Sequence, residues 1–216
     1  MLKFLMKHAP FLRGPMKRFL LWRYDHTKHG PDSWVVRWFV TIRVAEYDGP
    51  HDVIIAGDSV VAAVEPALEA IPGKDVRVTA WPGLKLSDLK ENFFQLIRIY
   101  NPKSIRFDGG GNDFLSGRDP DLIYEDLRWV VAMAKSFCKD VAWINIVPLR
   151  GHDEMNEATG KFNQLVASSG LVKVVDIRTP LSDETGRLRE DCAAPDGIHN
   201  LPPAIPVWVE TIGRSL

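Results

Sequence analysis

From residue 51 to the end of the chain, short apolar runs rich in β-branched residues alternate with longer segments of helical periodicity. This alternation is typical of a parallel sheet that is covered by helices on both faces. The sequence therefore predicts an α/β protein with about five parallel strands. The predicted strands are residues 53–56, 76–80, 105–108, 141–147 and 172–177.

The segments between these runs have apolar residues at helical spacing. In one of them, Leu86, Leu89, Phe93, Leu96 and Ile97 share a face, behind a potential cap at Ser87. We interpret such faces as core-facing. The predicted helices are residues 60–70, 86–97, 122–137, 155–167 and 202–214.

The first 48 residues differ from the rest in composition. They hold nine Lys or Arg against four Asp or Glu, and they include Trp22, Trp34, Trp38 and Phe39. We therefore predict an N-terminal extension over 1–48 and a single α/β domain over 49–216. The extension has no clean amphipathic period, so packing against the domain or a partner subunit is favoured over peripheral binding to an anionic membrane.

Composition excludes several classes of function. The formal net charge is −1 and the pI is near 6.6, so nothing in the overall charge favours nucleic acid as a partner. The two cysteines, Cys138 and Cys192, lack metal-site spacing and indicate a reducing compartment, with one disulfide between them left open.

The chain has no convincing targeting or membrane segment. Pro10, Gly14 and Pro15 interrupt the basic and apolar start, which argues against a signal peptide. The apolar segment 34–44 is too short to cross a bilayer and contains two arginines. We expect a cytoplasmic protein without a transmembrane helix.

Candidate functional residues follow the predicted strands. In an open parallel sheet, ligands bind beyond the carboxyl ends of the strands. Ser59, Gly83, Asn112 and Asp176 occupy such positions. These four residues are therefore the first candidates for functional residues.

A serine hydroxyl needs a base to remove its proton, and histidine is the usual base. His199 is the favoured candidate, because Asp196 lies three residues earlier and can fix its tautomer. Asp176 is a rival for the role of the acid. Ser59 would lie at a strand-to-helix turn, where helix amides favour developing negative charge.

An acyl-transfer site also needs donors to the oxyanion. The side-chain amide of Asn112 and the backbone N–H groups of Gly83 and Ser59 form a candidate three-donor hole. Each residue has an ordinary structural alternative: Ser59 as a helix cap, Asn112 and Asp196 as turn residues, and His199 as a half-exposed surface histidine. The order in which they occur favours the functional interpretation.

Other clusters carry weaker signals. His152, Asp153 and Glu154 have no second set of ligands and fit the solvated start of a helix. The glycines at 109–111 lack the Lys-Ser/Thr pair of a phosphate loop. We therefore assign no metal, no nucleotide and no cofactor.

Four segments resemble the blocks of the SGNH hydrolase superfamily, also called GDSL esterases and lipases: Gly57-Asp58-Ser59, Gly83, Gly110-Gly111-Asn112-Asp113 and Asp196-Gly197-Ile198-His199. The resemblance covers about residues 53–201. It implies a flavodoxin-like three-layer α/β/α sandwich, with Ser59 as nucleophile, His199 as base, Asp196 as its acid, and Ser59, Gly83 and Asn112 as the oxyanion hole.

The activity that the resemblance implies is hydrolysis of a small-molecule carboxylic ester through an acyl-enzyme. No insertion is long enough to form an obvious lid, which favours short acyl groups. The alternatives are a non-catalytic carbohydrate- or lipid-binding module on the same fold, and a lysophospholipase or thioesterase that acts at a membrane surface.

Overall fold

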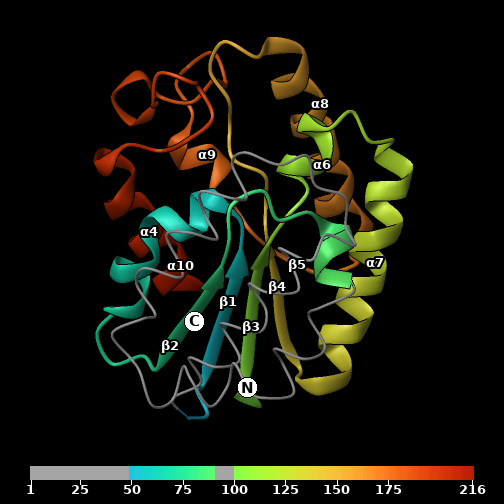
Figure 1. Ribbon diagram of the computed structural model, residues 1–216, viewed down its shortest axis with the longest axis vertical. Helices are drawn as coiled ribbons and strands as arrows, with labels where there is room; N and C mark the ends of the chain where they lie inside the picture. The colour runs from blue at the N-terminus through green and yellow to red at the C-terminus, as the bar shows by residue number, and fades with distance from the viewer. Residues whose placement is uncertain (1–48, 91–99) are drawn as a thin grey trace, which may run out of the picture.

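A single parallel sheet organises the domain. The computed structural model describes residues 49–90 and 100–216 (Figure 1), so the predicted extension over 1–48 lies outside the described residues. The strand order is β2-β1-β3-β4-β5 and every pairing is parallel, as the sequence predicted. The strands are β1 (Val53–Gly57), β2 (Val76–Ala80), β3 (Ser104–Asp108), β4 (Asp140–Ile144) and β5 (Lys173–Val175).

The register brings the carboxyl ends of β1 and β3 together. Val53 pairs with both Val76 of β2 and Ser104 of β3, and Ala56 pairs with Phe107. In this strand order the chain reverses direction across the sheet between β1 and β3, and the crevice at that switch point is where such folds bind ligands. The predicted positions of Ser59 and Asn112 follow these two strands.

Helices cover both faces of the sheet (Figure 1). Side chains alternate along each strand, so Ile55 belongs to a core with α4 and α10, whereas Phe107 belongs to a core with α7 and α8. The result is the three-layer α/β/α sandwich that the sequence predicted. The long helices are α4 (Ser59–Glu69), α7 (Pro120–Phe137), α8 (Asp153–Ser169) and α10 (Ile205–Ser215).

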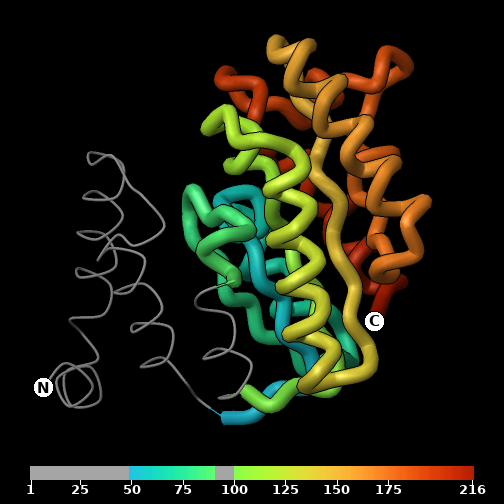
Figure 2. The backbone as a smooth tube through the Cα atoms, turned by 90° about the vertical axis from the view of Figure 1, so that its right-hand side faces the viewer, coloured from blue at the N-terminus to red at the C-terminus, as the bar shows by residue number. Residues whose placement is uncertain are grey.

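Shorter helices lie in the connections: α6 (Gly111–Leu115), α9 (Arg178–Leu181), η2 (Glu190–Cys192) and η3 (Pro202–Ala204). In Figure 2, α6 and the connection that follows α9 lie at the same end of the domain. This end carries the loops that follow the strands, so residues far apart in sequence meet there.

The last two strands are shorter than predicted. After β4, the peptide of Ile146 is held by the Asn163 side chain, which accepts from its N–H at 3.1 Å and donates to its carbonyl at 2.8 Å. Asn145 likewise accepts from the N–H groups of Ile177 and Arg178 at 2.9 and 3.0 Å. Side chains thus replace the regular sheet ladder, and apolar patterning does not reveal such a replacement.

The helix predicted over 86–97 begins at the predicted residue, but its cap differs from the expectation. Helical residues begin at 86, and the Asp88 carboxylate accepts from the N–H of Lys85 at 2.9 Å, as in one half of a capping box. Ser87 is therefore inside the helix and is not its cap. The rest of the predicted helix, including Phe93, Leu96 and Ile97, lies outside the described residues.

The two cysteines do not form a disulfide. Both are buried and free, and they belong to the cores on opposite faces of the sheet. Burial raises the pKa of both thiols, which disfavours the reactive thiolate. Among the described helices, none combines the length and apolar character needed to cross a membrane.

Candidate active site

The nucleophile candidate stands at the start of α4. The side chain of Asp58 accepts from the N–H of Val60 at 2.8 Å, which makes Asp58 the N-cap and Ser59 the first helical residue. The structural alternative in which Ser59 itself caps the helix is therefore wrong. At this position the helix dipole favours negative charge close to Ser59.

Ser59 and His199 meet although 140 residues separate them in the sequence. The Oγ of Ser59 lies 3.0 Å from the Nε2 of His199. On the other side of the ring, Nδ1 of His199 lies 2.6 Å from Oδ2 of Asp196. The fold thus brings all three predicted residues into one hydrogen-bonded chain.

Local hydrogen bonds hold Asp196 in its ionised form. Desolvation acts to raise its pKa, but hydrogen bonds from the His199 side chain and from the N–H groups of His199 and Ile198 outweigh it and lower the pKa to about 2. An ionised Asp196 holds the proton of His199 on Nδ1, because only that tautomer donates to a carboxylate. Nε2 is then left with its lone pair directed at the hydroxyl of Ser59.

Asn112 lies in α6, beside the nucleophile rather than in a free loop. Its Nδ2 donates to Oδ2 of Asp58 at 2.8 Å and to the carbonyl of Leu84 at 3.1 Å. The amide is therefore anchored to the residue that precedes Ser59. Its second bond ties it to the segment that follows β2.

Gly83 occupies the turn after β2, one residue before Leu84. Its φ of 74° lies in the left-handed region, which glycine adopts without a steric penalty. The turn is closed by a hydrogen bond from the N–H of Leu84 to the carbonyl of Trp81. This places Gly83 next to the contact between Leu84 and Asn112.

Asp113, the last residue of the segment that contains Asn112, connects two parts of the site. It is buried, its Oδ2 accepts from the N–H of Leu86 at 2.9 Å, and its Oδ1 pairs with Arg118 at 2.8 Å. Burial raises its pKa against these two partners. Asp113 therefore ties α6 to the segment that follows β2.

Asp176, the rival acid, is engaged elsewhere. Its Oδ1 accepts from the Asn145 side chain at 2.8 Å and from the N–H of Thr179 at 3.1 Å, at the start of α9. Desolvation acts to raise its pKa, but the hydrogen bonds from Thr179 and Asn145 outweigh it and lower the pKa. Asp196, and not Asp176, is the carboxylate that contacts His199.

The loop that carries Asp196 and His199 rests on the segment after β4. The N–H of Arg150 donates to the carbonyl of Gly197 at 2.9 Å, and Nε2 of His152 lies 2.9 Å from the carbonyl of Asp196. Gly197 has a φ of 69°, and a Cβ there would lie 1.8 Å from the carbonyl oxygen of Arg150. Only glycine fits this close approach of two backbones.

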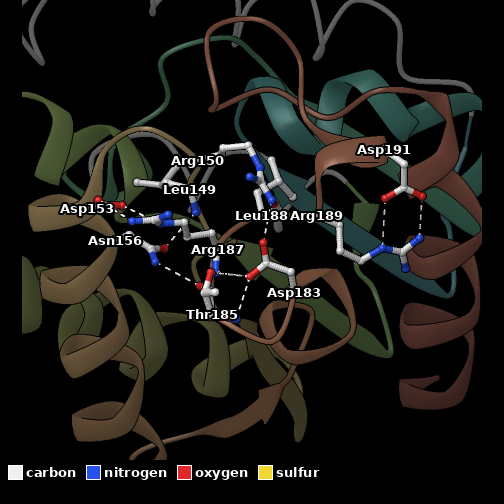
Figure 3. Close-up of polar contacts among 11 residues, drawn as sticks. Leu149, Arg150, Asp153, Asn156, Asp183, Thr185, Arg187, Leu188, Arg189 and Asp191 are labelled. Atoms are coloured by element: carbon white, nitrogen blue, oxygen red, sulfur yellow. Dashed lines mark hydrogen bonds and ion pairs between the residues drawn. The ribbon is translucent and has the colours of Figure 1, made fainter.

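Polar contacts fix the preceding part of the same connection (Figure 3). The Arg150 side chain donates to the carbonyl of Leu188 and to Asp183, both at 2.6 Å. Arg187 makes two bonds to Asp153, at 2.8 and 2.6 Å. His152 and Asp153 therefore do more than solvate the start of α8. His152 contacts the loop that carries Asp196 and His199, and Asp153 contacts the connection that precedes it.

A small cavity opens beside Ser59 and His199, with a volume of about 80 Å³. Its apolar lining includes Ile146, Leu149 and Met155. Larger hollows, of about 560 and 590 Å³, lie around Arg178 and are open surface depressions away from Ser59. Of these hollows, only the small cavity adjoins both Ser59 and His199.

The sequence interpretation gave no role to two carboxyl groups of the site, Asp58 and Asp108. Both line the cavity and both are only 6% exposed. Asp108 ends β3, so the strand-end rule that selected Ser59 and Asn112 also covers it. The sequence could therefore have indicated Asp108 as a candidate, but only the fold shows that it lies beside Asp58.

Solved structures share this fold at low sequence identity. A GDSL-like lipase from Bacteroides thetaiotaomicron VPI-5482 has a TM-score of 0.71 at 14% identity, over 83% of this chain and 96% of that one. A catalytic mutant of an acetylxylan esterase from Geobacillus stearothermophilus has a TM-score of 0.63 at 18% identity, over 77% of this chain and 94% of that one. By sequence, the chain matches no protein-family model and no curated protein.

The chain therefore has the fold of the GDSL, or SGNH, hydrolases. This confirms the flavodoxin-like α/β/α architecture that the four sequence segments imply.

Proposed function

We propose that the protein is a serine esterase that hydrolyses short-acyl carboxylic esters through an acyl-enzyme. The observation that carries the proposal is the chain from Ser59 to His199 to Asp196, with distances of 3.0 and 2.6 Å, at the wall of a small apolar cavity. A nucleophile, a base and an orienting acid within hydrogen-bond reach are the requirements of acyl transfer by serine. The likeness to esterases and lipases of this fold supports the same class of reaction.

In the first half-reaction, Oγ of Ser59 attacks the ester carbonyl while its proton passes to Nε2 of His199. The carbonyl oxygen becomes an oxyanion, which accepts hydrogen bonds from the N–H groups of Ser59 and Gly83 and from the amide of Asn112. The intermediate collapses when His199 returns the proton to the leaving alcohol. Ser59 then carries the acyl group.

In the second half-reaction, water attacks the acyl carbonyl and gives a proton to His199. Collapse of the second intermediate releases the carboxylic acid, and the proton returns to Oγ of Ser59. Asp196 stays ionised throughout, and its negative charge stabilises the imidazolium that forms in each half-reaction.

The size of the cavity supports a short acyl group. A volume of about 80 Å³ is far below the roughly 300 Å³ at which pockets begin to hold drug-sized ligands. Ile146, Leu149 and Met155 make its wall apolar, which suits the methyl or ethyl end of an acetyl or propionyl group. The alcohol part would lie toward solvent, where His199 is 46% exposed.

The proposal is tested with p-nitrophenyl esters of increasing acyl length and the variant Ser59→Ala. We expect the wild type to prefer acetyl over octanoyl esters, and Ser59→Ala to lose at least about 10³-fold in kcat. A fluorophosphonate should label the wild type and leave the variant unmodified. Unchanged turnover or labelling in Ser59→Ala would contradict the assignment.

Ser116→Ala is the matched control. This serine lies at the end of α6, and its hydroxyl donates to the carbonyl of Asp113 at 2.8 Å rather than to a histidine. The control should keep both labelling and turnover. A folded wild type that neither hydrolyses esters nor reacts with the fluorophosphonate would favour a binding module on the same fold.

A further inference from the structure

Two carboxyl groups are buried against each other beneath the candidate nucleophile. Asp58 and Asp108 follow or end the adjacent strands β1 and β3, both are buried, both line the small cavity beside Ser59, and each carboxyl group influences the pKa of the other. The triad mechanism described above does not use either carboxyl group.

A hydrogen bond between two carboxyl groups requires a proton, because an ionised carboxylate can only accept. The surroundings indicate which group holds it. Asp58 caps α4 and accepts from Val60 and Asn112, so its negative charge is stabilised by two donors and by the helix dipole. Asp108 ends β3 and does not cap the next helix, α6, whose N-cap is Gly110 and has no side-chain cap bond. Asp108 therefore holds the proton better.

The electrostatics agree with this placement. Burial, followed by repulsion from Asp58, raises the pKa of Asp108 well above its usual range. Burial also raises the pKa of Asp58, but the hydrogen bonds from Val60 and Asp108 and the attraction of His199 oppose that rise. The pair therefore carries one negative charge, on Asp58.

Resting on the proposed esterase function, we propose that Asp108 is a protonated positioning residue, whose O–H donates to Asp58 and thereby holds the Asn112 amide in place for the oxyanion. The order of contacts is Asp108 to Asp58, Asp58 to Asn112 at 2.8 Å, and Asn112 to the reacting oxygen. Asp108 acts through these partners and does not take part in the proton transfer at Ser59.

The proton also limits the negative charge near the reacting oxygen. A second ionised carboxylate beside Asp58 would oppose the oxyanion and would repel Asp58 away from Asn112. The titratable groups that face this pair are His199 and Asp113. Lys85 and Arg118 in turn face Asp113, and Asp196 faces His199.

The sign of the pH effect follows from the raised pKa of Asp108. Above about pH 4 the unfolded chain has lost this proton while the folded protein still binds it, so its contribution to stability falls as the pH rises toward the folded pKa. Activity that depends on the protonated form is likewise lost on the alkaline side. An asparagine at 108 keeps a hydrogen-bond donor and cannot ionise. Asp108→Asn should therefore remove this pH dependence from both stability and activity.

Infrared spectroscopy of the wild type with ¹³C-labelled aspartate carboxyl groups tests the proton directly, without any substrate. We expect the carbonyl band of a protonated carboxyl group to persist at pH 7, and to disappear in Asp108→Asn. Absence of the band in the wild type, or its persistence in the variant, would overturn the proposal. Because this measurement needs no turnover, it tests the proton on Asp108 even if the proposed esterase activity is not found.

Kinetics of Asp108→Asn and Asp108→Ala test the positioning role. We expect Asp108→Asn to keep kcat within about threefold, and Asp108→Ala to lose about tenfold or more in kcat with little change in KM, because the oxyanion donor acts in the transition state. Asp108→Asn should also lack the fall in kcat at alkaline pH that we expect of the wild type. Equal losses in both variants, or no loss in either, would show that the carboxyl group does not position Asn112.

Asp176→Ala is the matched control for the loss of a strand-end carboxylate. Asp176 follows β5, and it contacts Asn145 and Thr179 instead of the nucleophile side. The control should keep kcat and its pH profile. If Asp176→Ala also lost tenfold in kcat, the effect of Asp108→Ala would be a general effect of removing a carboxylate from the edge of the sheet.

Discussion

The two halves of the candidate site are built in opposite ways. On the nucleophile side, Asp58 and Asp108 are each 6% exposed and Asp113 is fully buried. On the base side, the side chains of His199 and Asp196 are 46% and 47% exposed. One half is embedded in the carboxyl edge of the sheet, whereas the other lies on a surface loop.

This difference decides what holds each half in place. Buried carboxyl groups depend on hydrogen bonds and on where protons reside, because desolvation penalises any unpaired charge. The exposed loop is held instead by backbone contacts, such as that of Arg150 with Gly197. The nucleophile side should therefore depend on where the proton of the two buried carboxyl groups lies, and the base side should depend in addition on backbone geometry.

The sharpest test of the base side is Asp196→Asn. The amide cannot hold the His199 proton on Nδ1 as a carboxylate does, so we expect kcat for p-nitrophenyl acetate to fall about 10²- to 10⁴-fold. Asp176→Asn should stay near wild type, because its carboxylate contacts α9 and not His199. If the two variants lost activity equally, Asp196 would not be the orienting acid.

A smaller effect is expected from Gly197→Ala. The new Cβ would collide with the carbonyl of Arg150, which must move the loop that carries His199. A shift of about 1 Å can cost about 10²-fold in rate, which the rate of fluorophosphonate labelling would measure.

Gly186→Ala is the matched control for this substitution. Gly186 has a φ of 77°, close to the 69° of Gly197, but a Cβ at this position would meet no atom within 4 Å. Gly186→Ala should therefore show only backbone strain, with a loss of about 1 kcal/mol in the free energy of unfolding. Its rate of fluorophosphonate labelling should equal that of the wild type. Equal labelling by the two variants would mean that the contact with Arg150 does not position the loop.

The smallest effect is expected from Arg187→Ala. Its pair with Asp153 is exposed, at 44% and 62%, and exposed ion pairs contribute about 0–1 kcal/mol, less at high salt. Thermal unfolding in low and high salt would measure this loss, while kcat should stay unchanged. A tenfold fall in kcat would show that the ion pair, rather than backbone contact, holds the catalytic loop.

Much of the fold could be predicted because it depends on local patterns. Apolar runs located the strands, and the strand-end rule selected Ser59 and Asn112 before any contact was known. The ends of β4 and β5 were missed, since the side chains of Asn145 and Asn163 take over backbone hydrogen bonds there. Apolar patterning cannot distinguish a buried strand from a buried extended segment of this kind.

By itself, the sequence determined the order of the elements and the types of residue at each strand end, because periodicity and turn preferences are properties of neighbouring residues. Only the tertiary structure decided which carboxylate faces His199, that Asp58 caps α4 and holds Asn112, and that Asp108 lies buried against Asp58. These are contacts between segments far apart in the chain. Their energies come from burial and proximity, which exist only once the sheet has brought its strand ends together.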